Sequence, residues 1–514
     1  MYELKSSYLN KIACCSILLI ACVFCFNNIS LRPLHVDESV NGFFVTQIWE
    51  NGFYTYDPGN YHGPLAFYLF QISEKIFGFG VHSFRILSAV FLFLTVLFIL
   101  RNRIVLGKYA CLFIAIATAL SPGMIYFRRS SIHESAFVFF QILMITGFLK
   151  ARENMSRQGL LWFFAGFLGA ILLKETFVIL GVAFALAWLW LEISPGMINW
   201  IKIKDDLPKR PEFGKTEKVF FLKISFIVVV VWLVFYTGFF HHWKGASDFF
   251  IALMPWFKTG VKGSGHDKPF FYWIRLMSRY EWVALIGVIA ACAGIVSRSW
   301  KIRFLSALAL VNGFIYSYIP YKTPWCIVSI LWPFVFVAGL WFEFISVKLQ
   351  PKKTFAFIVS VSLTSVVLIH SAVMAYIINF KNYEDTSEPY VYVQTRNDFK
   401  IIGNIIQKRT ESSPDFHNTP VLIKLNDTWP FPWFLSRFPH VRYGDHREAT
   451  KRGEDIIFSE TTADDRDLAG LYWRRLINVR EARVPIYVYL KISAFDGMVL
   501  PGFSIVQGQG TKVF

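Results

Sequence analysis

The sequence has few charged residues, which excludes an ordinary soluble enzyme. Only 17% of its 514 residues are charged, whereas 55% are hydrophobic and the mean hydropathy is +0.44. Soluble globular proteins contain more charge and less apolar surface. The composition therefore predicts a mainly α-helical, polytopic membrane protein.

Cysteine is also scarce, and its placement excludes a disulfide-stapled domain. All seven cysteines lie in or beside apolar runs, and the part of the chain after residue 380 has none. Disulfides therefore do not help to hold that part together. The stretch "CVFC" has the spacing of a zinc site, but it lies inside the first apolar run, where packing is the ordinary role of such residues.

Motifs for nucleotides are missing as well. The sequence has no Walker A or glycine-rich phosphate loop, and it has no Asp-rich motif of the kind that binds nucleotide sugars through a metal. A donor other than a nucleotide requires neither. No cofactor is predicted with certainty, although a divalent cation at Asp37, Glu38 and nearby histidines stays open.

Eleven apolar runs are long enough to cross the ~30 Å hydrocarbon core of a bilayer. The first lacks a small-residue cleavage site and sits among many others, so it predicts an uncleaved span rather than a signal peptide. The runs cover residues 10–28, 81–100, 109–122, 131–149, 159–174, 176–192, 219–240, 281–297, 303–319, 326–346 and 354–379.

Basic residues gather in every second loop, for example in "IKIKDDLPKRPEFGKTEK" and "SRSWKIR". The positive-inside rule places these loops and the N-terminus in the cytoplasm. They account for much of the formal net charge of +17, so that charge does not indicate a nucleic-acid partner. The sequence thus predicts an inner (plasma) membrane domain over 1–380 and an extracytoplasmic domain over 381–514.

The other loops carry acids and cations near the ends of the spans. A charge at mid-bilayer costs about 2.5 to 3.5 kcal/mol on insertion scales, so such groups normally face a protein-lined cavity. Lys174 and Glu175 have an alternative role as a short external turn between two spans. The notable groups in these loops are Asp37, Glu38, His62, Arg128, Arg129, Glu134, Lys174, Glu175, His266 and Lys322.

The stretch after the first span predicts a helix on the outer membrane surface. Val40, Phe43, Phe44 and Ile48 recur at helical spacing, and Gly52 follows as a stop signal. Asp37 falls at the expected N-cap. One interpretation is that it merely caps the first turn, which leaves Glu38 and His35 unexplained.

The C-terminal part predicts a small α/β domain. Strand-like runs occur at "VLIKL", "DIIFS" and "IYVYLK", and helix-like segments lie near 396–409 and 465–478. The segment "NDTWPFPWFL" is too rich in proline for a regular helix and predicts a rigid loop. This loop either forms a ledge for an acceptor or packs the domain onto the membrane.

Several motifs, in order along the chain, resemble those of the C-type glycosyltransferases, multi-span enzymes that use polyprenyl-phosphate sugars. The Asp-Glu pair after the first span, "GPLAFYLF", "YFRRSSIHESAF", "GSGHDKPFFYW" and "YKTPWCIVSILWPFVFVAG" carry the resemblance. They are most similar to the branch of protein mannosyltransferases and the lipid A aminoarabinose transferase. The set, with "KETF", "HHW" and "WPFPWFL", looks closest to the flippase activity-associated family. Many relatives have Lys-Pro-Pro where this chain has His62, Gly63 and Pro64.

The predicted function is that of a membrane glycosyltransferase, a hexosyl- or pentosyltransferase. It moves a sugar from a polyprenyl-phosphate donor to an extracytoplasmic lipid, glycan or protein by inverting displacement. A carboxylate takes the acceptor's proton, and cations hold the leaving phosphate. A polyprenyl-linked glycan flippase, or its accessory protein, is the alternative. The expected catalytic carboxylates are Asp37, Glu38 and Glu134, with Asp37 as the base, and the expected substrate-binding residues are His62, Arg128, Arg129, Lys174, Glu175, His266 and Lys322. Arg129 has a second possible role as a lipid-headgroup anchor.

Overall fold

The computed structural model divides the chain into two compact units. The first comprises Met1–Ile29 and Asn51–Tyr383, and the second comprises Ser30–Glu50 and Glu384–Phe514. The second unit thus combines the segment after the first helix with the C-terminal part of the chain. The structure describes residues 2–154, 156–200, 206–208, 214–262, 265–349, 354–444, 453–463, 465–480 and 484–507.

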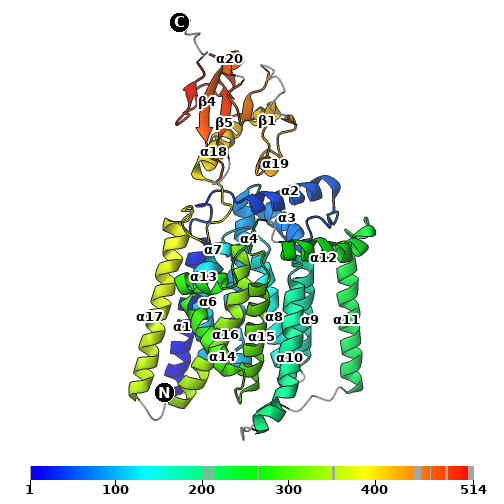
Figure 1. The fold of residues 1–514 in the computed structure, drawn as a ribbon, viewed down its shortest axis with the longest axis vertical. Helices are drawn as coiled ribbons and strands as arrows, with labels where there is room; N and C mark the ends of the chain where they lie inside the picture. The colour runs from blue at the N-terminus through cyan, green and yellow to red at the C-terminus, as the bar shows by residue number, and fades with distance from the viewer. Residues whose placement is uncertain are drawn as a thin grey trace. The chain divides into compact units, whose positions relative to one another are not determined.

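The first unit consists of helices, most of which stand side by side (Figure 1). They are α1 (Tyr2–Phe26), α3 (Leu65–Phe77), α4 (Val81–Arg101), α5 (Arg103–Leu106), α6 (Lys108–Leu120), α7 (Pro122–Arg128), α8 (Glu134–Asn154), α9 (Arg157–Leu173), α10 (Phe177–Trp200), α11 (Lys215–Tyr236), α12 (Lys244–Lys262), α13 (Tyr272–Tyr280), α14 (Trp282–Gly294), α15 (Trp300–Tyr318), η1 (Pro324–Cys326), α16 (Ile327–Leu349), α17 (Thr354–Tyr376) and η2 (Ile377–Lys381).

Each of the eleven predicted spans coincides with one of these helices. Among the described residues, seven helices are long and apolar enough to cross a membrane: α1, α4, α8, α10, α11, α16 and α17. The bent pair α6 and α7 makes an eighth span if it counts as one. Of the remaining three, α9 and α14 are shorter apolar helices, and α15 does not meet the same criteria. The prediction of a helical, polytopic membrane protein is confirmed.

The bend of 57° between α6 and α7 follows from a proline. Ser121 is extended, and Pro122 begins α7. Proline disfavours the helical conformation in the residue before it, so α6 cannot continue through Ser121. Buried Glu281 accepts hydrogen bonds from the Gly123 amide (2.6 Å) and from Ser121 Oγ (2.8 Å). These bonds fix the start of α7, which ends at Arg128.

Helices α8 and α9 pack with their backbones in close contact. A Cβ on Gly166 of α9 would lie 2.3 Å from the amide nitrogen of Met144 in α8, so only glycine fits there. Small residues allow this approach between helices in membranes. Because α8 and α9 are consecutive and antiparallel, the start of α8 and the end of α9 lie at the same end of the unit. Glu134 and Lys174 occupy those two positions.

Helix α12 runs across the end of α11 rather than beside it (Figure 1). Phe250, Met254, Phe257 and Val261 are exposed and recur at helical spacing along it. Lys244, at its start, is also exposed, whereas Asp248 is buried. An exposed apolar stripe on such a helix is typical of a helix in the membrane interface.

The second unit is an α/β domain, as predicted. Its mixed sheet has the strand order β2-β1-β3-β5-β4-β6. The pairs β1–β2 and β1–β3 are parallel, and the pairs β3–β5, β4–β5 and β4–β6 are antiparallel. The elements are α2 (Val36–Asn51), α18 (Asn397–Ser412), η3 (Pro414–Asn418), β1 (Val421–Lys424), α19 (Phe431–Phe434), β2 (Val441–Tyr443), β3 (Ile456–Ser459), α20 (Asp465–Leu468), β4 (Tyr472–Ile477), β5 (Ile486–Lys491), η4 (Ile492–Ala494) and β6 (Ser504–Ile505).

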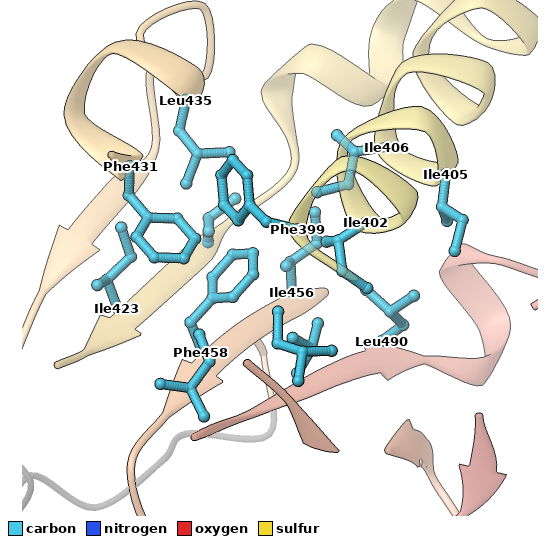
Figure 2. Close-up of a cluster of buried hydrophobic side chains, with 14 of the residues drawn as sticks. Phe399, Ile402, Ile405, Ile406, Ile423, Phe431, Leu435, Ile456, Phe458 and Leu490 are labelled. Atoms are coloured by element: carbon cyan, nitrogen blue, oxygen red, sulfur yellow. The ribbon is translucent and has the colours of Figure 1, made fainter. Parts of the chain in front are cut away.

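The core of this unit lies between α18 and one face of the sheet (Figure 2). Phe399, Ile402 and Ile406 of α18 pack with Phe458 of β3 and Leu490 of β5. All of these side chains are at most 3% exposed. Burial of such side chains contributes about 1.5 to 3 kcal/mol each, so a stable core forms without disulfides.

All three predicted strands of this unit are confirmed, as β1, β3 and β5, and so is the helix predicted near 396–409, as α18. The helix predicted over 465–478 is wrong. Only Asp465–Leu468 is helical, and Tyr472–Ile477 forms strand β4. Gly470 has a φ of 71°, a left-handed conformation that ends the helix and favours glycine. Strand β4 starts with two aromatic residues and ends with a β-branched one, residue types that favour strands, and it pairs with β5 along its length.

The proline-rich segment 426–435 contains one helical turn, α19, and no longer helix. Phe431 and Trp433 are buried within the second unit. A Cβ on Gly42 of α2 would lie 2.3 Å from the Trp433 ring. These two aromatic side chains therefore pack inside this unit rather than forming an exposed ledge.

Candidate functional site

Five side chains from three separate segments of the first unit form one cluster, which we call the paired cluster: His62, His133, Glu134, Lys174 and Glu175. His62 Nδ1 lies 2.8 Å from Glu175 Oε2, and Lys174 donates to Glu134 Oε1. The His62 and His133 rings lie 4.5 Å apart between centroids, which connects the two pairs. The structure thus brings together four of the predicted site residues, which are up to 113 positions apart in sequence.

Local backbone geometry explains how these residues meet. The Gly63 amide donates to Leu173 O (3.1 Å), and a Cβ on Gly63 would lie 2.2 Å from Leu172 O. Glycine at this position therefore lets the segment that carries His62 lie directly against the end of α9. Lys174 is extended (φ −153°, ψ 139°) and ends α9, and the Phe177 amide donates to Lys174 O as α10 begins.

The alternative of a short turn at Lys174 and Glu175 is thus correct for the backbone. It does not describe the side chains, because Lys174 is 5% exposed and Glu175 is 7% exposed. A buried charge persists only when it is paired. Both residues have a partner of opposite or variable charge in the cluster.

The cluster shifts the protonation of its members in opposite directions. Burial lowers the pKa of Lys174, but the charge and hydrogen bond of Glu134, together with the Glu175 charge and Cys326, raise it by more, so the net pKa lies well above the usual range. Burial raises the pKa of Glu175, but the interaction with His62, the Lys174 charge and a backbone hydrogen bond together lower it by more, so the net pKa is lowered. Burial, together with His62 and Lys174, lowers the pKa of His133 well below its usual value. The structure therefore favours ionised Lys174 and Glu175 and a neutral His133.

Sequence reasoning omitted His133 from the site, although it precedes Glu134 in a motif that carries the resemblance. Tyr56 and Tyr236 were also missed. Their rings make an edge contact at 4.8 Å, the Tyr236 hydroxyl donates to Ile171 O (2.8 Å), and Glu175 acts electrostatically on both. No local signal identifies these tyrosines, because the sequence has many aromatic residues in similar loops.

Arg128 and Arg129 are neighbours with different environments. Arg129 donates to the carbonyl oxygens of Asn27 (2.6 Å) and Asn28 (2.8 Å), just after α1, and its guanidinium lies 4.7 Å from the Phe380 ring. Cations stabilise the C-terminal ends of helices in this way. Arg129 thus holds the end of α1, and the structure gives no support for its predicted role in substrate binding.

Arg128 is fully buried at the end of α7. Its Nη1 donates to Thr95 Oγ1 (3.0 Å), and within the described residues its Nε and Nη2 have no hydrogen-bond partner. A buried guanidinium in this state can accept an anion, because both unused nitrogen atoms are donors.

Lys322 and His266 lie together, away from the paired cluster in the sequence but within the same unit. Lys322 Nζ donates to the carbonyl oxygens of Ile319 (2.5 Å) and Lys268 (3.0 Å), and the Lys322 amide donates to His266 O (3.1 Å). Burial lowers the pKa of Lys322. An ammonium has three donors, so one remains for a ligand.

In the second unit, His35, Asp37 and Glu38 form the start of α2. The helix begins at Val36, so the prediction of Asp37 as the N-cap is wrong and His35 is the cap. His35 Nδ1 accepts from the Asp37 amide (3.1 Å), Glu38 Oε2 accepts from the His35 amide (2.8 Å), and His35 Nε2 donates to Tyr392 O (2.8 Å). This reciprocal pattern is a capping box with histidine in place of serine or threonine.

The two acids at this helix start therefore differ. Glu38 is fully buried and caps the backbone, which explains Glu38 and His35 without a catalytic role. Asp37 is half-buried, and within the described residues its carboxylate has no hydrogen bond or ion pair. Of the pair, Asp37 has the carboxylate that is free to accept a proton.

The described residues contain no group of three or more His, Cys, Asp or Glu side chains that could hold a metal ion. The acids and histidines of the cluster are instead engaged with Lys174 and with one another.

The fold is similar to that of solved membrane enzymes. ArnT from Cupriavidus metallidurans, bound to undecaprenyl phosphate, superposes with a TM-score of 0.58 at 14% identity, over 93% of this chain and 98% of ArnT. The apo structure of the same protein gives 0.57 at 14% identity, over 95% and 99%. The chain has the fold of the C-type glycosyltransferase superfamily.

A sequence family described as dolichyl-phosphate-mannose-protein mannosyltransferase matches residues 61–204 of the chain. That range contains the whole paired cluster. No curated protein matches the chain in sequence. The resemblance drawn from the motifs is confirmed at the level of the superfamily, and the closer likeness to the flippase activity-associated family stays a prediction.

Proposed function

We propose that this protein is a membrane glycosyltransferase that moves a sugar from a polyprenyl-phosphate donor to an extracytoplasmic acceptor. The observation that carries the proposal is the cluster of acids, histidines and a lysine that the first unit builds in a chain with the C-type fold. The comparisons support it, because the matched family is described by a dolichyl-phosphate-linked sugar and the ArnT structure contains undecaprenyl phosphate.

The proposed reaction is an inverting displacement. The acceptor attacks the anomeric carbon, its proton passes to Asp37, and the polyprenyl phosphate leaves. A positioned base typically contributes ~10²- to 10⁴-fold to the rate. Asp37 suits this role because its carboxylate has no hydrogen bond or ion pair within the described residues, unlike those of Glu38 and Glu134.

Cations stabilise the charge that develops on the leaving phosphate. Arg128 and Lys322 are the candidates, because both keep unused donors, whereas Arg129 is engaged with the end of α1. Lys174 is engaged with Glu134, so we assign it to the integrity of the cluster rather than to direct phosphate binding.

The proposal is tested by incubating the purified full-length chain with a panel of radiolabelled polyprenyl-phosphate sugars. We expect hydrolysis or transfer of at least one hexose or pentose, and loss of this activity on boiling. Intact protein that consumes no member of the panel would contradict the proposal.

The orientation of the proposed active side is tested separately. Lys209 and Asp445 both lie outside the described residues, and the basic loops predict that they lie on opposite sides of the membrane. Reporter fusions at the two positions should report the cytoplasm and the exterior, respectively. A shared side would overturn the assignment of an extracytoplasmic site.

A further inference from the structure

His62 is the member of the paired cluster that reaches the surface. Its side chain is 27% exposed, whereas the side chains of Glu175, Lys174 and Glu134 are 6%, 6% and 3% exposed. His133 is 4% exposed. Any substrate that exchanges a proton or a hydrogen bond with this cluster therefore does so through His62.

The hydrogen bond to Glu175 fixes which nitrogen of His62 is available. Nδ1 lies 2.8 Å from Glu175 Oε2 and donates to it, since a carboxylate accepts. Nε2 has no hydrogen-bond partner within the described residues. Gly63, held against the end of α9, keeps the ring beside Glu175. The arrangement is an oriented imidazole–carboxylate pair with a free nitrogen.

The charged groups near His62 do not balance when both histidines are neutral. The groups that face His62 are Glu175 from the break between α9 and α10, His133 from the segment before α8, and the adjacent Tyr61 ring. Behind them lies the Lys174–Glu134 pair. Two carboxylates and one ammonium leave a net charge of −1 if both histidines are neutral. An imidazolium at His62 makes the cluster neutral and removes its repulsion of a phosphate.

We propose that His62 and Glu175 form an acid–base dyad in which the His62 imidazolium protonates the phosphate that leaves the sugar. This inference rests on the proposed function. The bond between the anomeric carbon and the phosphate oxygen breaks, its electron pair stays on that phosphate, and the phosphate takes the Nε2 proton. The acceptor's proton goes to the base of the reaction, and His62 regains a proton from solvent.

Histidine suits this step better than the other cations of the unit. Imidazole is the side chain that commonly exchanges a proton near neutral pH, where a phosphate monoester, with a second pKa of about 6, also exchanges one. Lysine and arginine stay protonated there, so they hold charge without delivering a proton. The dyad therefore predicts a dependence on pH that Arg128 or Lys322 cannot produce.

The test measures binding of undecaprenyl phosphate to the purified full-length chain between pH 5.5 and 8.5, with undecaprenol as the uncharged control ligand. We expect wild-type binding to weaken with rising pH by up to ~10-fold per unit once His62 loses its proton. His62→Lys keeps its charge, so it should match wild type at pH 5.5 and bind more tightly than wild type at pH 8.5. Glu175→Gln removes the anionic partner, so its weakening should begin at lower pH.

His82→Gln is the matched control, because His82 is a histidine of the same unit whose Nε2 donates to Phe77 O. This variant should follow the wild-type binding profile. The phosphate of the ligand titrates in the same way with every variant, so it does not account for a difference between their profiles. Parallel profiles for wild type and His62→Lys would overturn the dyad. Equal binding of undecaprenol and undecaprenyl phosphate would also overturn it.

The same variants in the transfer assay separate this inference from the proposed function. Transfer by wild type with a pH profile that His62→Lys leaves unchanged contradicts the dyad alone. The absence of transfer from every polyprenyl-phosphate sugar contradicts the proposed function, whatever the binding profiles are.

Discussion

The acids of the paired cluster and the acids at the start of α2 differ in what neutralises them. In the cluster, Glu134 and Glu175 each face a side chain that carries or can carry a positive charge. At the start of α2, Glu38 accepts a hydrogen bond from a backbone amide, and the Asp37 carboxylate has no hydrogen bond or ion pair within the described residues. Carboxylates that look equivalent in the sequence thus have three different roles: pairing, capping and, as we propose, catalysis.

The difference teaches that adjacency in sequence does not imply a shared role. Asp37 and Glu38 are neighbours, yet one is half-buried and the other is fully buried, because adjacent residues of a helix project about 100° apart. Glu134 and Lys174 are 40 positions apart and form one ion pair. The following predictions use single side chains to break or sharpen this comparison.

The largest loss of stability is expected from breaking the buried ion pair. Lys174→Met leaves Glu134 buried and uncompensated, which costs about 3 to 5 kcal/mol. Thermal unfolding of the detergent-purified variant should show a much lower Tm. The double variant Glu134→Gln/Lys174→Met removes both charges and should recover much of the loss. A single variant as stable as wild type would show that the pair is not structural.

A smaller loss is expected at the start of α2. Glu38→Ala removes the acceptor of the His35 amide and leaves that buried group unsatisfied, at a cost of about 1 to 3 kcal/mol. Glu38→Gln keeps an acceptor oxygen and should be milder in the same measurement of Tm. If instead Glu38→Ala retains its Tm and loses transfer, the capping role is wrong and Glu38 takes part in the reaction.

The smallest effect is a dependence of stability on pH that arises from His133. Burial holds its pKa well below the usual value, so the unfolded chain binds a proton below pH ~6.5 that the folded chain does not. Stability from a neutral His133 is present above that pH and is lost as the pH falls, by up to ~1.4 kcal/mol per unit.

The check is Tm between pH 7.5 and 5 for wild type and for His133→Gln. The variant should lose less stability than wild type over this interval, since its side chain does not titrate. Identical slopes would mean that His133 is protonated, or accessible, in the folded protein.

The fold was largely predictable because its elements are long and local. Each of the eleven apolar runs became a helix, and three short runs of β-branched and aromatic residues became β1, β3 and β5. Strand β4 was not predicted, because its sequence suits a helix as well as a strand, and Gly470 and pairing with β5 decide between them. The grouping of Ser30–Glu50 with the C-terminal part depends on contacts across the whole chain.

The candidate site was predictable in its residue types but not in its pairings. The sequence pattern assigns four of the residues to the loops that alternate with the basic ones: His62, Glu134, Lys174 and Glu175. Nothing local indicates that Lys174 would bind Glu134 or that Glu175 would bind His62. Arg129 resembles a phosphate ligand in the sequence, but its donors are used at the end of α1. Only the tertiary structure determines which donors and acceptors remain unused.

The central claim is that Asp37 is the base of glycosyl transfer. It is tested most directly by measuring transfer and Tm for Asp37→Asn, with Glu50→Gln as the control, because Glu50 is an exposed acid of the same helix. The account predicts that Asp37→Asn loses ~10²- to 10⁴-fold in transfer with an unchanged Tm, and that Glu50→Gln keeps both. A stable Asp37→Asn protein that transfers sugar at the wild-type rate would contradict it.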